Sequence, residues 1–411
     1  MFVVHLFLIH SAVALSAAGQ QCSIAPDLAG GYQQGNLAKN QLKLSVDLLS
    51  AVSSANPSQN IILSPYSIYS AFTLLYFAAS GHTEKILRRF LHLPSDMSKN
   101  STFGVYSLER NNNKRKDSGG YEFYIADRIY VQQDLKVNDC VKSLFQNEYS
   151  LVDFNQKDVV TENINKWVEK ITKNAITNFL PKDYINSDTV LLMVNAVYFK
   201  GLWKNTFSEQ STFLEDFHLA DGSTKPVAMM HKKAQYRYIY TCDDNPVDLL
   251  ELPYEGDDVS MFIILPRQPR ASSIPKLLKH LTPKRLQGIL HDISQESLRT
   301  VDVTIPKFEI EQSLELKPIL EALGADELFS KNADLGDFVQ DTRNIVISKA
   351  LHKAKIEVDE KGTIAVGVTS MATILRSGIN GLRFRANHPF LYLICNKAKQ
   401  VVLFSGIFNS P

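Results

Sequence analysis

Hydrophobic residues recur at helical spacing in three segments of the first half of the chain. Asn40 to Leu49 and Thr161 to Leu180 each carry one apolar face, which predicts helices packed on a core. Residues 65–79 are apolar nearly all round, which predicts a buried helix. Ser64 before it is a plausible helix cap, and Pro65 suits the first helical turn.

Strand patterns dominate the later part of the chain. Val190 to Phe199 is almost continuously apolar, which predicts a central strand. Ile345 to Val358 is strand-like and places His352 on its apolar face. Phe390 to Ile394 and Gln400 to Ile407 predict a C-terminal hairpin. Helices therefore come early and strands late, without internal repeats or long linkers, which predicts one α+β domain. Other predicted elements are a strand at Tyr121–Tyr130, a helix at Ile274–Ile289, and a helix around Leu316–Leu323 that Gly324 closes.

Composition and charge narrow the classes of function. The chain has 411 residues, 45% hydrophobic and 21% charged, as in an ordinary globular protein. The formal net charge of +1 argues against a nucleic-acid partner. Residues 1–19 combine an apolar run with small residues near Ala18, which predicts a cleaved signal peptide and a secreted domain at 20–411. A membrane anchor is the alternative, but the run is short and interrupted by His5 and His10.

The cysteines leave the disulfide state open. In a secreted chain, four cysteines allow two bridges in three connectivities, and their wide spacing fits no metal site, so no metal is expected. They are Cys22, Cys140, Cys242 and Cys395.

Residues 100–120 are polar and predict a surface loop. Asn100 begins a glycosylation sequon in this stretch. A basic cluster follows, which indicates either a solvated loop or a site for a heparin-like polysaccharide, the one cofactor considered. Its members are Arg110, Lys114, Arg115 and Lys116. Asp117–Gly120 is similar to the segment around the nucleophile of chymotrypsin-like proteases, but its flanks do not match and a turn is expected instead.

The segment from Glu357 to Pro389 supports two interpretations. Its β-branched residues alternate with small ones, which suits a strand whose small face enters a crowded site. Arg376 followed by Ser377, in an accessible-looking run, is typical of the bait that a trypsin-like protease cleaves. On the residues alone, an ordinary strand and hairpin remains equally plausible.

From about Asn40 to its end, the chain resembles the serpin family, because many of the family's motifs occur in order. The matching segments are Asn60 with Ser64–Pro65 and Ser67, Asn165–Val168 with Thr172, Asn195–Trp203, Met229–Met230, Leu252–Tyr254, Ser260–Met261, Leu265–Pro266, Pro306–Phe308, Leu323–Gly324, His352–Lys353, Glu360–Thr363, Phe384, Pro389–Phe390, Phe404–Gly406 and Asn409–Pro411.

The resemblance implies three β-sheets, eight to nine helices and an exposed reactive-centre loop at about 360–388. It implies a suicide substrate that traps a serine protease as a covalent acyl-enzyme while the cleaved loop enters the main sheet, and not an enzyme. The family's seventeen-residue spacing from the hinge residue Glu360 places the reactive bond at Arg376–Ser377. Leu375 and Ile379 remain minor alternatives.

The resemblance also implies roles for side chains outside the loop. Four polar residues would form a hydrogen-bonded cluster where the main sheet parts, here called the shutter. They are Ser64, Ser67, Asn195 and His352. Trp203 would pack where the loop first enters the sheet, here called the breach.

The hinge departs from the inhibitory pattern of the family. Ile364 stands where a Glu is usual, and Val366, Gly367 and Val368 replace an alanine-rich run. The hinge residues expected are Glu360 and Gly362–Val368, namely Gly362, Thr363, Ile364, Ala365, Val366, Gly367 and Val368. A non-inhibitory serpin acting as a carrier or chaperone-like binding protein is therefore the alternative to inhibition.

The resemblance is to extracellular arthropod serpins in particular. It implies a glycoprotein that regulates protease cascades in clotting, melanisation or innate immunity. The partner expected is a trypsin-like serine protease, with no nucleic acid and no membrane, and the chain is expected to be a monomer.

Overall fold

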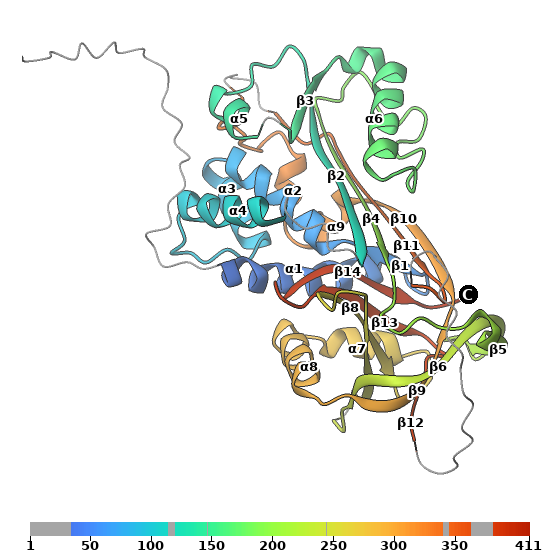
Figure 1. Ribbon diagram of the computed structural model, residues 1–411. Helices are drawn as coiled ribbons and strands as arrows, with labels where there is room; N and C mark the ends of the chain where they lie inside the picture. Colours follow the sequence, from blue (N-terminus) through green and yellow to red (C-terminus); the bar gives the residue numbers. More distant parts are fainter. Residues whose placement is uncertain (1–33, 114–119, 146, 244, 340–344, 363–380) are drawn as a thin grey trace, which may run out of the picture.

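The computed structural model describes residues 34–113, 120–145, 147–243, 245–339, 345–362 and 381–411 (Figure 1). These residues form helices α1–α9 and strands β1–β14. In the described part of the chain, no helix combines the length and apolar character needed to cross a membrane.

A five-stranded sheet forms the centre of the molecule, with strands in the order β10-β11-β4-β2-β3. The strands are β10 (Phe308–Glu315), β11 (Lys349–Val358), β4 (Leu191–Gly201), β2 (Tyr121–Gln132) and β3 (Tyr149–Val152). β11 and β4 run parallel, whereas β10–β11 and β4–β2 are antiparallel pairs. Every residue of β4 except Lys200 is buried, which confirms the predicted central strand.

The remaining strands form a nine-stranded sheet in the order β1-β14-β13-β8-β7-β6-β9-β12, with β5 beside β6. They are β1 (Ile61–Leu63), β5 (Phe213–His218), β6 (Thr224–Tyr240), β7 (Val247–Pro253), β8 (Val259–Pro266), β9 (Arg299–Pro306), β12 (Leu382–Arg385), β13 (Phe390–Asn396) and β14 (Val401–Phe408). The long strand β6 pairs with β5 and β9 along most of its length and with β7 only from Arg237 to Tyr240. This sheet therefore consists of two sheets joined through β6, in agreement with the expected three.

Helices cover both faces of the central sheet (Figure 1). They are α1 (Gln34–Ala55), α2 (Pro65–Ala78), α3 (Gly81–Phe90), α4 (Lys99–Asn113), α5 (Asp139–Leu144), α6 (Lys157–Ile171), α7 (Ser273–His280), α8 (Pro283–Gln295) and α9 (Leu316–Ala322). On one face α6 packs through Ile164 and Val168 against β2 and β4. On the other face α2 and α9 share a larger core with α1, while α7 and α8 pack on the nine-stranded sheet.

Two predicted helix boundaries are wrong. α6 ends at Ile171 because Lys173 and Asn174 adopt left-handed backbone conformations, so the helix stops well before Pro181. The helix predicted at Ile274–Ile289 is two helices, α7 and α8. The break comes where the Thr282 side chain caps α8 and Pro283 occupies its first turn.

The surface loop predicted around Asn100 is also wrong, because helix α4 runs from Lys99 to Asn113. Phe103 and Val105 are buried, and the ring of Phe103 packs edge-on against the ring of Phe77, with the ring centroids 5.3 Å apart. Burial of these few apolar side chains therefore outweighs the polar composition of the segment. Asn100 lies in the first turn of α4 and is partly exposed.

The four cysteines form at most one disulfide. Cys140 is disulfide-bonded, whereas Cys242 is a free thiol on the surface and Cys395 is a free thiol in the core. Cys22 lies outside the described residues. Two bridges, which the count of four permitted, are excluded.

Candidate functional site

The parallel pairing of β4 with β11 is the seam at which the central sheet could accept another strand. The pairing runs in register from Leu192–Lys349 to Tyr198–Lys355. After β11 the chain turns, with the amide of Asp359 donating to the carbonyl of Gly362 at 2.9 Å. A strand that folds back from this turn would run antiparallel to β11 and therefore also to β4. It would replace one parallel pairing by two antiparallel ones, which are slightly more stable per residue.

The shutter residues meet in the middle of this seam, as predicted. Asn195 of β4 lies directly opposite His352 of β11. Nδ1 of His352 contacts Oδ1 of Asn195, so a side-chain hydrogen bond crosses the seam. The amide nitrogen of Asn195 donates to Oγ of Ser67 at 2.6 Å. Both Asn195 and His352 are almost completely buried, so breaking these bonds without new partners would be costly.

The N-terminus of α2 hydrogen-bonds to His352 on the side of its ring away from Asn195. The backbone N–H of Ser64 donates to Nε2 of His352 at 3.0 Å. Oγ of Ser64 donates to the carbonyl of Leu403 in β14 at 2.7 Å and accepts from the amide of Ser67 at 3.2 Å. The predicted Ser64 cap and first-turn Pro65 are confirmed. The cap therefore ties α2, the seam and the nine-stranded sheet together.

Asp127 of β2 is a further member of the cluster that the sequence analysis missed. Its Oδ1 accepts hydrogen bonds from Oγ of Ser67 at 2.8 Å and from the amide of Asn195 at 2.6 Å. It lies opposite Asn195 in the β2–β4 pairing, so Asp127, Asn195 and His352 form one row across three strands. The predicted strand Tyr121–Tyr130 contains two acidic residues, Glu122 and Asp127, and no signal in the sequence singled out Asp127.

Burial shifts the pKa values of the two titratable groups of this row in opposite directions, each toward the neutral form of the group. Burial lowers the pKa of His352 to about 3, so its ring is neutral at physiological pH. Burial raises the pKa of Asp127 to about 8, although the hydrogen bond from Ser67 works in the other direction. A neutral His352 can accept the Ser64 N–H at Nε2 and donate from Nδ1 to Asn195.

Acidification is expected to remove the stability that His352 contributes. The native protein keeps this ring neutral down to about pH 3, whereas the unfolded chain takes up a proton near pH 6.5. The contribution should therefore be complete above pH 6.5 and fall by a few kcal/mol as the pH approaches 3. Urea unfolding of wild type and His352→Gln across this window isolates the effect, because all other titrations are shared. A difference in unfolding free energy that does not change with pH would contradict it.

Trp203 closes the breach at the end of the seam. Its ring stacks on Tyr254 with centroids 4.5 Å apart and planes inclined by 14°. Its indole Nε1 donates to the carbonyl of Asp359 at 2.9 Å, and its backbone amide donates to the carbonyl of Lys361 at 3.1 Å. Trp203 therefore contacts the turn that follows β11, and its role at the breach stays a prediction.

Glu360 is anchored at the same turn. Its carboxylate accepts from Nζ of Lys307 at 2.9 Å and from Oγ1 of Thr212 at 2.8 Å, and its side chain is only 7% exposed. Burial alone would raise the pKa of Glu360, but these hydrogen bonds hold it below its usual value. The carbonyl of Glu360 also accepts the amide of Phe207 at 2.7 Å. The predicted hinge therefore begins at a charge-paired and well-anchored residue.

Position 362 must be a glycine, because the structure leaves no room there for a side chain. Its φ is +120°, and a Cβ there would lie 2.2 Å from the carbonyl oxygen of Gly201. The two glycines allow the turn after β11 to lie against the end of β4, where Leu202 and Gly362 form an isolated bridge.

Several predicted site residues lie outside the described residues. These are Thr363, Ile364, Ala365, Val366, Gly367 and Val368 of the hinge, Arg376 and Ser377 of the reactive bond, and Lys114, Arg115 and Lys116 of the basic cluster. Arg110 lies near the end of α4. The structure brings together the shutter in one cluster, and Trp203, Glu360 and Gly362 in another.

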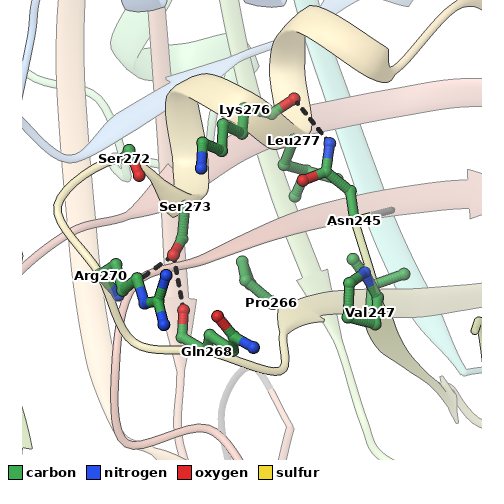
Figure 2. A pocket seen from close by; sticks show the side chains of 10 residues that line it. Asn245, Val247, Pro266, Gln268, Arg270, Ser272, Ser273, Lys276 and Leu277 are labelled. Carbon is green, nitrogen blue, oxygen red and sulfur yellow. Dashed lines mark hydrogen bonds between the residues drawn. The ribbon is translucent and has the colours of Figure 1, made fainter. Parts of the chain in front are cut away.

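A small cavity elsewhere in the fold contains none of the predicted site residues. Figure 2 shows it between α7 and the segment that follows β8. Its volume is about 100 Å³. Inside it, Oγ of Ser273 accepts from the amide of Arg270 at 3.1 Å and donates to the carbonyl of Gln268 at 2.5 Å. These local bonds stabilise the start of α7, so the cavity is not part of the functional site.

Comparison with known proteins identifies related chains along almost the whole length. A family model described as "Serpin (serine protease inhibitor)" matches residues 39–411. "Serine protease inhibitor 88Ea" of Drosophila melanogaster is 34% identical, over 100% of this chain and 99% of its own. "Intracellular coagulation inhibitor 2" of Tachypleus tridentatus is 34% identical, over 85% and 86%. The crystal structure of maspin is 28% identical with a TM-score of 0.81, and covers 92% of this chain and 99% of its own.

Proposed function

The chain belongs to the serpin family, and we propose that within it this protein is a secreted suicide-substrate inhibitor of a trypsin-like serine protease. The observation that carries the proposal is the β4–β11 seam, with the hinge residue Glu360 anchored at its end. The seam offers a place for a strand antiparallel to both neighbours. The loop that would supply this strand follows Gly362 directly.

The proposed reaction begins as ordinary proteolysis. The serine of the protease attacks the carbonyl carbon of Arg376, and the nitrogen of Ser377 leaves with a proton as a new amino terminus. The Arg376 guanidinium fits an acidic specificity pocket through charge-assisted hydrogen bonds. The protease is then held by an ester bond to Arg376 until water hydrolyses it.

Insertion of the loop competes with that hydrolysis. Residues 363–375 contain neither proline nor a charged residue, so they can join the sheet without breaking a ladder or burying a charge. Each residue added gains about 1 kcal/mol per net hydrogen bond. Movement of Arg376 along the sheet would drag the attached protease with it and distort its catalytic site before deacylation.

Secretion is part of the proposal. The leader predicted at residues 1–19 and the disulfide bond of Cys140 support an oxidising, extracellular environment. The name of the Tachypleus relative refers to coagulation, which supports a role in a clotting, melanisation or immune protease cascade. We also propose glycosylation at Asn100, and a heparin-like polysaccharide site at the end of α4 formed by Arg110 and residues 114–116.

Incubation with trypsin tests the function. Wild type is expected to give a complex that survives SDS, with mass spectrometry placing the cut after Arg376. Arg376→Glu should form no complex, because its side chain does not fit the specificity pocket. Arg270→Glu is the matched control: Arg270 is an exposed arginine between β8 and α7, outside the loop, and its replacement should leave complex formation unchanged. Complete cleavage after Arg376 without any complex would refute inhibition.

A carrier function is the second candidate, and one observation favours it. A cavity of about 580 Å³ lies between α1, α8 and the nine-stranded sheet. Its walls include the apolar residues Leu42, Phe262, Leu290, Val401 and Val402 and the basic residues Lys39, Arg237 and Lys284. A carrier on this fold would bind an amphipathic ligand without needing loop insertion, so the two candidates differ in what cleavage does to stability.

A further inference from the structure

The carboxylate of Asp127 is surrounded by neutral groups. Ser67 of α2 and Asn195 of β4 donate to it, and His352 of β11 lies beyond Asn195. The neighbouring charged residue of β2, Arg128, instead holds its guanidinium 4.3 Å from the ring of Trp167 on α6. No charged side chain of the described residues contributes to the environment of Asp127. Its negative charge is therefore compensated only by dipoles, including the N-terminal end of α2.

The hydrogen bonds of the shutter form a chain in which each donor and acceptor can be assigned from the one before it. The chain starts at the Ser64 N–H, which can only donate, so Nε2 of His352 must accept. Nδ1 then carries the hydrogen and donates to Oδ1 of Asn195. The amide nitrogen of Asn195 is left to donate to Asp127 and Ser67. An acceptor at position 127 therefore reinforces the orientation of the Asn195 amide that His352 requires.

We propose that Asp127 is a positioning residue for loop insertion: it orients the Asn195 amide that holds the seam closed, and its negative charge makes the seam easier to part. The inference rests on the proposed function, because the seam is where the loop would insert. Asp127 acts through Asn195 and touches neither the protease nor the reactive bond.

The two effects of Asp127 oppose one another. As a hydrogen-bond acceptor it strengthens the bond between Asn195 and His352 that spans β4 and β11. As an anion without a cationic partner in a half-buried site it is less well solvated than in water, and parting of the strands admits more water to it. Burial raises the pKa of Asp127 to about 8, so the anion becomes predominant only under mildly alkaline conditions. His352 stays neutral there, because burial holds its pKa at about 3.

Two substitutions separate the effects. Asp127→Asn keeps an acceptor oxygen and removes the charge, so the seam should stay closed more firmly at high pH. Asp127→Ala removes one acceptor of the Asn195 amide, so Asn195 is held less firmly and the seam should part more readily at every pH. A residue that merely filled space would give two variants with effects in the same direction.

The rate at which the full-length protein takes up a synthetic peptide with the sequence of residues 363–376 measures seam opening without a protease. For wild type, uptake at pH 9 is expected to be about tenfold faster than at pH 6, the equivalent of one pKa unit. Asp127→Asn should show no such increase. Asp127→Ala should be faster than wild type at pH 6 by about fivefold, as for loss of one hydrogen bond to a neutral group.

The inference is overturned if Asp127→Asn keeps the pH dependence of wild type, or if wild type takes up no peptide at either pH. It is also overturned if Asp127→Ala, when folded, is slower than wild type at pH 6. If Asp127→Ala does not fold, the pH profile of Asp127→Asn decides. The trypsin experiment with wild type reports on the proposed function separately, so a protein that takes up peptide but traps no protease would refute inhibition alone.

Discussion

Cleavage of the loop after Arg376 is expected to raise the midpoint of thermal unfolding by more than about 10 °C. The freed strand would pair with both β4 and β11, where the intact protein has one parallel pairing from Leu192–Lys349 to Tyr198–Lys355. New ladder hydrogen bonds and the burial of the small face together should contribute roughly 10 kcal/mol. Differential scanning calorimetry before and after limited cleavage measures the shift.

A matched pair of variants shows whether insertion causes this gain. Ala365 lies on the alternate face expected to be buried, and Ile364 on the opposite face. Cleaved Ala365→Arg should lose the stabilisation, because a charge would have to enter the core. Cleaved Ile364→Arg should retain most of it. If cleaved wild type is no more stable than the intact protein, the chain does not insert its loop and the carrier function becomes the better proposal.

Replacing Glu360 with lysine is expected to destabilise the intact protein by roughly 3–5 kcal/mol. The carboxylate of Glu360 is buried and bonded to the half-exposed Lys307 and to Thr212, so the substitution places a second cation next to Lys307 at a buried position. The turn after β11 should then detach from the end of β4. An opened seam exposes unpaired strand edges, to which the loop of a second molecule can add.

Size-exclusion chromatography at 45 °C should therefore show chains of Glu360→Lys where wild type remains monomeric, and the unfolding free energy should fall. Glu209→Lys is the matched control, because Glu209 pairs with the adjacent Lys361 at 3.5 Å but its side chain is 69% exposed. Loss of such a surface pair should cost less than about 1 kcal/mol and cause no assembly. Equal effects of the two substitutions would mean that Glu360 does not anchor the turn.

Much of the fold followed from local patterns. The continuous apolar run became β4, and the all-round apolar helix after Ser64 became the buried α2, because both patterns report burial directly. Boundaries were less predictable where a few residues decided them. The left-handed residues after Ile171 ended α6, and a handful of buried side chains made a helix of the polar segment around Asn100.

The residues of the site likewise divide into those that the sequence predicted and one that it did not. The shutter, Trp203 and Glu360 were expected from the serpin resemblance, and each lies beside the seam. Asp127 was not expected, because nothing local distinguishes a buried acid from an acid on the exposed face of a strand. Its role depends on strand register, which brings it opposite Asn195 and, through Asn195, next to His352.

By itself, the sequence determined that the chain is an α+β protein with serpin motifs, and it predicted a bait for a trypsin-like protease at Arg376, because burial patterns and motifs depend on residues close together in the chain. Only the tertiary structure decided that β11 pairs in parallel with β4 and that Lys307 and Thr212 hold Glu360. It also placed the carboxyl group of Asp127 beside the seam, in hydrogen-bonding contact with Ser67 and Asn195. These contacts join residues far apart in the chain, so strand register and packing determine them and local preference does not.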